Sequence, residues 1–217
     1  MDIPPIIGFS GKIASGKTTT AAAVMNLLYH DYGLNYLRIS FGSALRDEVD
    51  EILDYTHHME YDPGTRLDTY TRIRDVDKNV VDTVVHTLRK HSNPRRAAMQ
   101  LWGTSVRRGN NNNYWVDRVF DSIPACHPMV IVDDVRFVNE AERIHSVGGV
   151  LVRLEVNPAV QKHRLSSTRG KNYDNSVLTH VSETELDTYP FFDLVVDNNH
   201  TGAHPAQAAV DGLFSSR

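Results

Sequence analysis

The chain has 217 residues, of which 41% are hydrophobic and 23% charged, a size and balance that suit one compact α/β domain. Its formal net charge of -4 argues against a general nucleic-acid binder or a protein of anionic membrane surfaces, so any anionic ligand must be held by a local group of cations. The single cysteine, Cys126, cannot form an internal disulfide. We therefore expect a cytoplasmic protein, since the chain also shows no signal-peptide pattern and no run of the ~20 apolar residues that span a bilayer.

Apolar runs and helical stretches alternate in the first part of the chain. A strand is expected at residues 3–9, a helix at 17–29, a strand at 36–41 and a helix at 44–53. Residues 56–75 contain many turn formers and no sustained period, which predicts an irregular excursion or a mobile segment.

The middle of the chain is expected to be helical. Valine and leucine recur every four residues at Val76, Val80, Val84 and Leu88, with Val81 and Val85 beside them. Pro94 is placed to begin a helix that runs to Leu101. These helices are expected to pack on one another. The asparagine run at 110–113 is expected to form a surface loop.

The second half of the chain continues the alternation of strands and helices. Residues 129–132 are continuously apolar, as in a strand covered on both faces of a parallel sheet, and Asp133 and Asp134 follow directly. The later elements are a helix at 139–147, a strand at 150–154, a polar stretch at 161–182, a strand at 192–196 and a helix from about Pro205. This order predicts a parallel sheet with helices on both faces, in a single domain over residues 1–217.

One segment has the spacing of a phosphate-binding loop. The run GKIASGKT, from Gly11 to Thr18, matches G-x-x-x-x-G-K-[ST] at every fixed position and lies between a predicted strand and a predicted helix. In such a loop the backbone N–H groups and the helix N-terminus face phosphate oxygens, the lysine reaches the β and γ phosphates, and the hydroxyl of the final residue binds Mg²⁺. Lys12 stands at an unconstrained position and need not touch ligand. The nucleotide-binding residues expected here are Gly11, Ala14, Ser15, Gly16, Lys17, Thr18 and Thr19.

A magnesium nucleotide site also needs a carboxylate beside the loop. Asp133 and Asp134 stand at the end of the apolar strand, where ligands bind in parallel sheets. Neighbouring strand side chains point in opposite directions, so one of the two is expected to face the metal. The other is expected to be a solvated strand end or a helix cap.

The arginines bear on what receives the phosphoryl group. Transfer to a phosphate acceptor brings two anions together, and several arginines are needed to hold the acceptor and to spread charge. The candidates are Arg46, Arg107, Arg108, Arg136, Arg164 and Arg169. Since the second strand is followed by no carboxylate that could act as a base, a phosphate acceptor is favoured over a hydroxyl acceptor.

Taken together, these segments resemble the phage-type deoxynucleoside monophosphate kinases. The resemblance rests on the loop and on FGSALRDEV, RRAAMQLWGTSVRRGNNNNYWVD, VIVDDVRFVNEAE, THVSETELD and FDLVVDNN, which together cover most of the chain. It implies a P-loop three-layer α/β/α kinase fold with about five parallel strands, a helical acceptor-binding region at about 43–122 and a short lid at about 160–182. It also implies ATP with Mg²⁺ as the donor, a deoxynucleoside monophosphate as the acceptor, and host cytoplasm as the location if a phage encodes the chain. The resemblance is also compatible with a homodimer.

The resemblance assigns roles residue by residue. Asp134 looks like the family aspartate, because the pattern Asp-x-Arg then places Arg136 at the transferring or acceptor phosphate. Glu140 also matches, and Arg46 and Arg107 look like arginines of the acceptor site. Trp102 is either a ring that stacks on the acceptor base or a core residue.

Further matches concern the later part of the chain. Asn198 is similar in position to the adenine-side loop of related kinases, and Arg164 and Arg169 flank the expected lid. His180 and Glu183 match a family motif but receive only a positional role. Residues 56–75 match no part of the family pattern, which leaves the base specificity open.

Two other functions remain as alternatives. One is a P-loop kinase of another small molecule, such as dephospho-coenzyme A or phosphomevalonate. The missing carboxylate after the second strand counts against the first of these, and the GTSVRR and THVSE segments count less firmly against both. The other is a switch that binds a nucleoside triphosphate without transferring phosphate. The Asn-Lys-x-Asp motif of GTPases is absent from the sequence, which disfavours a GTPase switch.

Overall fold

The structure is a computed structural model that describes residues 3–62, 64–127, 129–169, 178–199 and 205–215, without the side chain of Arg169. The chain forms two compact units. The first unit consists of the chain up to Ser40 and from Ser122 onward, and the second is Phe41–Asp121. Within the described ranges, no helix is both long enough and apolar enough to cross a membrane.

The first unit contains a five-stranded sheet in which all neighbouring strands are parallel. Its strands are β1 (Ile6–Gly11), β2 (Leu37–Ile39), β3 (Val130–Val135), β4 (Val150–Glu155) and β5 (Leu194–Asp197), and their order is β2-β3-β1-β4-β5. The expectation of a parallel sheet of about five strands is confirmed. Because β1 is the central strand, the loop that follows it opens at the middle of the carboxyl edge, where ligands bind in such sheets.

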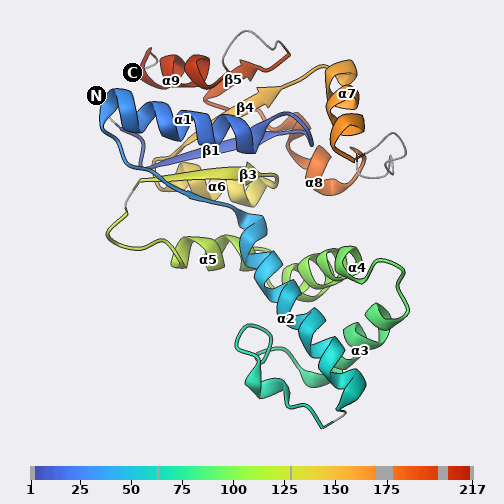
Figure 1. Cartoon of the computed structure of the whole chain (residues 1–217). Helices are drawn as coiled ribbons and strands as arrows, with labels where there is room; N and C mark the ends of the chain where they lie inside the picture. The colour runs from blue at the N-terminus through green and yellow to red at the C-terminus, as the bar shows by residue number, and fades with distance from the viewer. Residues whose placement is uncertain (1–2, 63, 128, 170–177, 200–204, 216–217) are drawn as a thin grey trace. The chain divides into compact units, whose positions relative to one another are not determined.

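Helices cover both faces of this sheet, as Figure 1 shows. On one face, α1 (Lys17–Tyr32) and α9 (Pro205–Ser215) pack over Ile7 and Phe9 of β1. On the other face, α6 (Val138–Ser146) comes close to β1 because Gly8 has no side chain: a Cβ there would lie 2.7 Å from Cδ1 of Ile144. This is the three-layer α/β/α fold of P-loop proteins that the sequence predicts.

The described residues between β4 and β5 include α7 (Pro158–Arg169), α8 (Val181–Thr184) and the 3₁₀ turn η4 (Glu185–Thr188). The sequence assigned no secondary structure to the polar stretch at 161–182, and its first part, up to Arg169, belongs to α7. Residues 170–177 of the expected lid lie outside the described part of the chain.

The second unit is helical throughout its regular structure. Its elements are α2 (Phe41–Tyr61), the 3₁₀ turn η1 (Leu67–Thr69), α3 (Lys78–Arg89), α4 (Pro94–Gln100), the π-helix η2 (Leu101–Arg108) and α5 (Tyr114–Asp121). Local chemistry sets two of these starts: Asp77 accepts a hydrogen bond from the N–H of Asn79, and Asn93 accepts one from Arg96 with Pro94 in the first turn. Buried Ile52, Val84 and Trp102 belong to one core.

Residues 56–75 differ from the irregular excursion that was expected. The helix α2 continues past Leu53 to Tyr61, since no helix-breaking residue precedes Pro63 and Gly64 and the buried Tyr55 anchors its last turns. After η1 the chain returns to the core, where Ile73 is fully buried. The first residues of this stretch are thus helical, and Ile73 connects the otherwise irregular remainder to the core.

Three other expectations about the second unit need correction. In α3, Val80 is 40% exposed, whereas Val81, Val84, Val85 and Leu88 form the buried face, so the period is mixed three and four rather than strictly four. The helix expected to run to Leu101 continues as the π-helix η2 to Arg108. The helix α5 was not expected as a separate element, although it falls in the helical region at about 43–122 that the resemblance implies.

Candidate functional site

The loop between β1 and α1 has a backbone conformation that depends on its glycines. Gly11 and Gly16 have φ values of 148° and 91°, and Ala14 has a φ of 60°. A Cβ on Gly16 would lie 2.5 Å from Nδ2 of Asn198, and one on Gly11 would lie 2.5 Å from Oγ of Ser15. Both glycines are therefore required for conformation and for space. The loop ends at Lys17, where α1 begins and its first N–H groups are available to an anion.

Lys17 lies buried within this loop. Its Nζ donates hydrogen bonds to the carbonyl oxygens of Gly11, at 2.6 Å, and of Lys12, at 2.9 Å. Burial lowers the pKa of Lys17 to about 7, and the positive charge of Arg136 acts in the same direction. The negative charges of the Glu183 and Asp134 carboxylates oppose this lowering of the pKa.

The two aspartates at the end of β3 face different surroundings. Asp133 is buried, and its Oδ2 lies 3.8 Å from Nε of Arg38 on β2. Asp134 is partly buried, and its negative charge raises the pKa of Lys17, against the effect of burial. The turn beyond them is fixed by Glu140, whose Oε2 accepts hydrogen bonds from the N–H groups of Arg136, at 2.8 Å, and Phe137, at 3.1 Å.

Three carboxylates at alternate positions in α8 and η4 reach different parts of this site. Glu183 forms an ion pair with Arg136 and accepts a hydrogen bond from the N–H of Ile13 in the loop. Glu185 accepts a hydrogen bond of 2.9 Å from the N–H of Val138, at the start of α6. Asp187 pairs with Lys12 of the loop and with Arg153 of β4, the latter at 3.2 Å.

The loop backbone is also held from the side of α7 and the end of β5. Nδ2 of Asn198 donates to the carbonyl of Ser15 at 2.7 Å. Arg164 donates to the carbonyl of Asn198 at 2.8 Å and to that of Ala14 at 3.5 Å. Asn198 and Arg164, expected at the adenine side and at the lid, both meet the loop in this structure. The expected partner of Arg164 in the lid, Arg169, has its side chain outside the described part of the chain.

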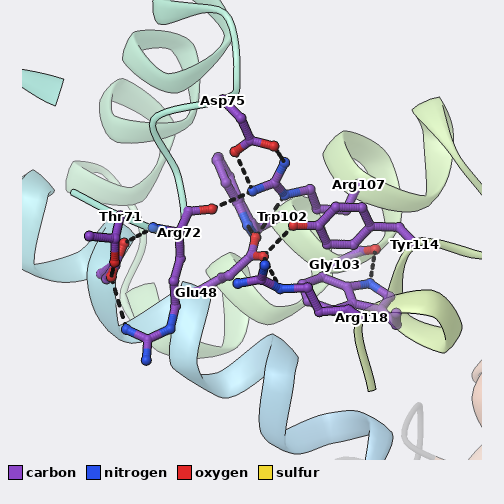
Figure 2. Close-up of polar contacts among 11 residues, drawn as sticks. Glu48, Thr71, Arg72, Asp75, Trp102, Gly103, Arg107, Tyr114 and Arg118 are labelled. Atoms are coloured by element: carbon purple, nitrogen blue, oxygen red, sulfur yellow. Dashed lines mark hydrogen bonds and ion pairs between the residues drawn. The ribbon is translucent and has the colours of Figure 1, made fainter. Parts of the chain in front are cut away.

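The second unit contains a separate buried polar network around Glu48, drawn in Figure 2. Glu48 is fully buried on α2 and accepts hydrogen bonds from Nε1 of Trp102, at 2.8 Å, from Nε of Arg107, at 2.7 Å, and from the hydroxyl of Tyr114. Nε of Arg118 lies 3.6 Å from the same carboxylate. Burial, reinforced by the bond to Glu48, raises the pKa of Tyr114 well above its usual value.

Arg107 is the cation at the centre of this network. Besides Glu48 it binds both oxygens of Asp75, at 2.8 and 2.9 Å, and the carbonyl of Arg72, at 2.5 Å. Its guanidinium lies over the rings of Trp102 and Tyr114, at 5.2 and 4.4 Å from their centroids. Four of its five N–H groups are thus engaged within the protein, and its side chain is only 5% exposed.

The residues expected in an acceptor site differ in their exposure and in their contacts. Arg46 is exposed on α2. Trp102 is fully buried, so the core alternative describes its ring in this structure, and no face of it is open for stacking on a base. Arg107 serves the internal network, and Glu140 holds the backbone at Arg136.

Several polar residues of these two networks were missed by sequence reasoning. In the second unit they are Glu48, Asp75, Tyr114 and Arg118, and in the first unit Arg153, Asp187 and Lys12. A signal existed for Glu48 alone, because it shares helical spacing with Leu45, Val49 and Ile52 and therefore falls on an apolar face. The others are joined only by long-range contacts.

A cavity of about 430 Å³ opens elsewhere in the second unit. Its walls are Asp47, Asp50, Glu51, Asp54 and residues 69–72, so its charge disfavours a phosphate ligand. Among the described residues, no group of three or more histidine, cysteine or carboxylate side chains could hold a metal ion by itself. A magnesium ion that shares its ligands with phosphate needs fewer protein oxygens, and the hydroxyl of Thr18 with the carboxylate of Asp134 is chemically suited to that role.

Comparisons with known proteins agree with this fold. No protein-family model matches the chain. The sequence is 25% identical over 210 residues to a protein of Acanthamoeba polyphaga mimivirus that is named, provisionally, a deoxynucleotide monophosphate kinase, and the match covers 90% of this chain and 89% of the viral one. The crystal structure of TT1252 from Thermus thermophilus superposes with a TM-score of 0.50 and 17% identity, covering 97% of this chain and 96% of that one. The second match concerns the fold alone. The chain thus has the α/β fold expected of a P-loop protein and is similar, over nearly its whole length, to a protein named as a nucleotide kinase.

Proposed function

We propose that the protein is an ATP-dependent kinase that converts deoxynucleoside monophosphates into diphosphates. The observation that carries the proposal is the glycine-dependent loop at the carboxyl edge of the sheet, which surrounds Lys17 and is joined to Arg136 through Glu183. The similarity to the mimivirus protein supports the choice of reaction and acceptor.

The loop and the start of α1 would bind the phosphates of ATP. Backbone N–H groups at a helix N-terminus attract anions, and the ammonium of Lys17 adds a positive charge among them. With carbonyl oxygens as its hydrogen-bond partners, the buried Lys17 has a pKa of about 7. A phosphate placed against it would favour the charged form, so binding the nucleotide and protonating Lys17 support each other.

Magnesium fits this site through Thr18 and Asp134. When bound, the ion would neutralise charge on the β and γ phosphates and orient them. Thr18 is the second residue of α1, and Asp134 lies close enough to Lys17 to influence its pKa. Asp133 faces Arg38 instead, which makes it the less suitable ligand.

Arg136 would stabilise the transferring phosphoryl group. Its guanidinium pairs with Glu183, which also binds the N–H of Ile13 in the loop, and its side chain is 29% exposed. Negative charge is spread over the phosphoryl oxygens during transfer, and an arginine that is already in place stabilises that charge with little reorganisation. A phosphate acceptor already carries an anionic oxygen, so the reaction needs no carboxylate base.

The helical second unit would bind the acceptor nucleotide. Arg46 on α2 is exposed and provides a cation for the acceptor phosphate, whereas Arg107 supports the unit from within. We assign Arg107 an indirect part because binding a phosphate would require it to leave Asp75.

The test is a survey of acceptors with a matched loop variant. The full-length protein is incubated with Mg-ATP and each deoxy- or ribonucleoside monophosphate in turn, and the products are separated by chromatography. We expect diphosphate product with one or more of the deoxynucleotides, and a loss of at least ~10²-fold in Lys17→Met, which keeps the length of the side chain but not its charge. If no monophosphate is converted by a folded protein that binds ATP, the proposed acceptor is wrong.

A further inference from the structure

The segment formed by α8 and η4 has no part in the reaction as described so far. Glu183 is its most buried carboxylate, with a side chain only 5% exposed. Both of its oxygens are used: Oε1 pairs with Nη1 of Arg136, and Oε2 accepts the hydrogen bond from the N–H of Ile13. One side chain therefore joins the phosphate-binding loop to the arginine of the turn after β3.

Glu183 is itself held in a fixed place. Two residues later, Glu185 binds the N–H of Val138 at the start of α6, and two residues beyond that, Asp187 binds Lys12 and Arg153. The short segment is thus tied to α6 on one side and to the loop and β4 on the other. A carboxylate anchored in this way can fix the orientation of whatever it binds.

Arg136 needs such an anchor. Its backbone N–H is fixed by Glu140, but its long side chain is partly exposed and has many rotamers. Among the described residues, its guanidinium is restrained by the ion pair with Glu183 and by a hydrogen bond that it donates to the carbonyl of Ser182 at 3.4 Å. Both come from the same short segment, which makes that segment the support for the orientation of Arg136.

Resting on the function proposed above, we propose that Glu183 is a positioning residue: its carboxylate holds Arg136 against the phosphate-binding loop, so that the guanidinium is directed at the phosphoryl group before transfer begins. Glu183 does not touch the reacting atoms in this account. Its loss should therefore be felt through Arg136 and in the transfer step more than in ATP binding.

The experiment is a double-mutant cycle on the full-length protein. The values of kcat, and of KM for ATP, are measured with labelled ATP for the wild type, Glu183→Gln, Arg136→Ala and the double variant. Glu142→Gln, at an exposed position of α6, is the control for the loss of one negative charge. Glutamine can still accept one hydrogen bond, but its amide nitrogen cannot accept the second.

We expect Glu183→Gln to lower kcat roughly tenfold and to change KM for ATP by less than about threefold, while adding less than about twofold to the loss already caused by Arg136→Ala. Glu142→Gln should leave both constants unchanged. An equal fall in kcat with and without Arg136 would overturn the proposal, as would a loss confined to KM. If Glu183→Gln does not fold, the cycle is repeated with Glu183→Asp, which keeps the charge but is too short to reach both partners, and the same outcomes apply.

The same set of variants separates this proposal from the proposed function. If the wild type forms no diphosphate with any acceptor, the proposed function fails, and the cycle is then measured on the rate at which the γ-phosphoryl group of Mg-ATP is released as inorganic phosphate. Coupling of at least about threefold between Glu183 and Arg136 would support the positioning role, whereas additive effects would overturn it.

Discussion

Arg107 and Glu48 form an ion pair in the interior of the helical unit, with Nε of Arg107 at 2.7 Å from Oε2 of Glu48 and side chains that are 5% and 0% exposed. Two further donors, from Trp102 and Tyr114, converge on the same carboxylate. A buried charge in this position is tolerated only while its partners remain, since an unpaired ion in a protein interior is strongly destabilising. The pair therefore links the stability of α2 to that of η2 and α5.

Glu48→Gln is expected to lower the free energy of unfolding by about 3 kcal/mol, because it leaves the guanidinium of Arg107 without its buried counter-charge. Chemical denaturation of the full chain measures this. Glu60→Gln, at an exposed position of the same helix, should change the free energy of unfolding by less than about 0.5 kcal/mol. Similar small effects of the two substitutions would contradict the burial and pairing of Glu48.

Asp75 gives the same network a dependence on pH. Hydrogen bonds from Arg107 hold the pKa of Asp75 below its usual 3.8. The unfolded chain therefore takes up this proton at a higher pH than the folded chain does, so the stabilisation is complete above about pH 5 and is lost as the pH falls below about 4. The difference in unfolding free energy between the wild type and Asp75→Asn should follow that curve. Because the side chain of Asp75 is 60% exposed, we expect a plateau of no more than about 1 kcal/mol. A difference that grows in acid would contradict this sign.

Gly16 and Gly33 offer a matched pair for the loop. Both have positive φ values, 91° and 68°, but a Cβ on Gly16 would lie 2.5 Å from Asn198, whereas Gly33 has open space around it. Each substitution to alanine should lower the free energy of unfolding by about 1 kcal/mol, because alanine adopts a positive φ less readily than glycine. Only Gly16→Ala should also weaken Mg-ATP binding, by at least ~10-fold, because the loop must shift to accommodate the methyl group. Calorimetric titration with Mg-ATP measures this, and equal affinities of the two variants would count against the proposed role of the loop.

The two aspartates of β3 are expected to differ in function. Asp134→Asn should lower the magnesium-dependent kcat by at least ~10²-fold, because the proposed metal site loses its carboxylate. Asp133→Asn should mainly affect stability, since its partner is Arg38 on β2. The kcat of each variant is measured across a range of Mg²⁺ concentrations. Equal losses would show that both carboxylates serve the site.

The sequence predicts the features of this fold that depend on local patterns. The apolar run of β3, the glycine spacing of the loop and Pro205 at the start of α9 each follow from a few adjacent residues. Residues 56–75 were misjudged because turn formers outweighed the buried Tyr55 that extends α2. Tertiary packing determined that segment, and local propensity did not.

In the candidate site, too, local sequence patterns identify some residues and not others. The residues of the loop and the Asp-x-Arg turn have fixed spacing, so the sequence identifies them. The residues that hold the loop and the turn in place have no such spacing, so the sequence does not identify them. Glu183 lies 170 residues from Ile13, and Asp187 lies 175 residues from Lys12. Arg107 shows the converse, because its sequence environment suggests a ligand contact, and only the folded chain reveals Glu48 and Asp75 as its partners.

The measurement that tests the central claim most directly is the fate of the γ-phosphoryl group of labelled ATP in the presence of a deoxynucleoside monophosphate. The account predicts that the label appears in the deoxynucleoside diphosphate, one for one with the ADP formed, and that little is released as inorganic phosphate. Release of the label as inorganic phosphate at a rate that does not depend on the acceptor would contradict it, because the protein would then hydrolyse ATP rather than transfer phosphate.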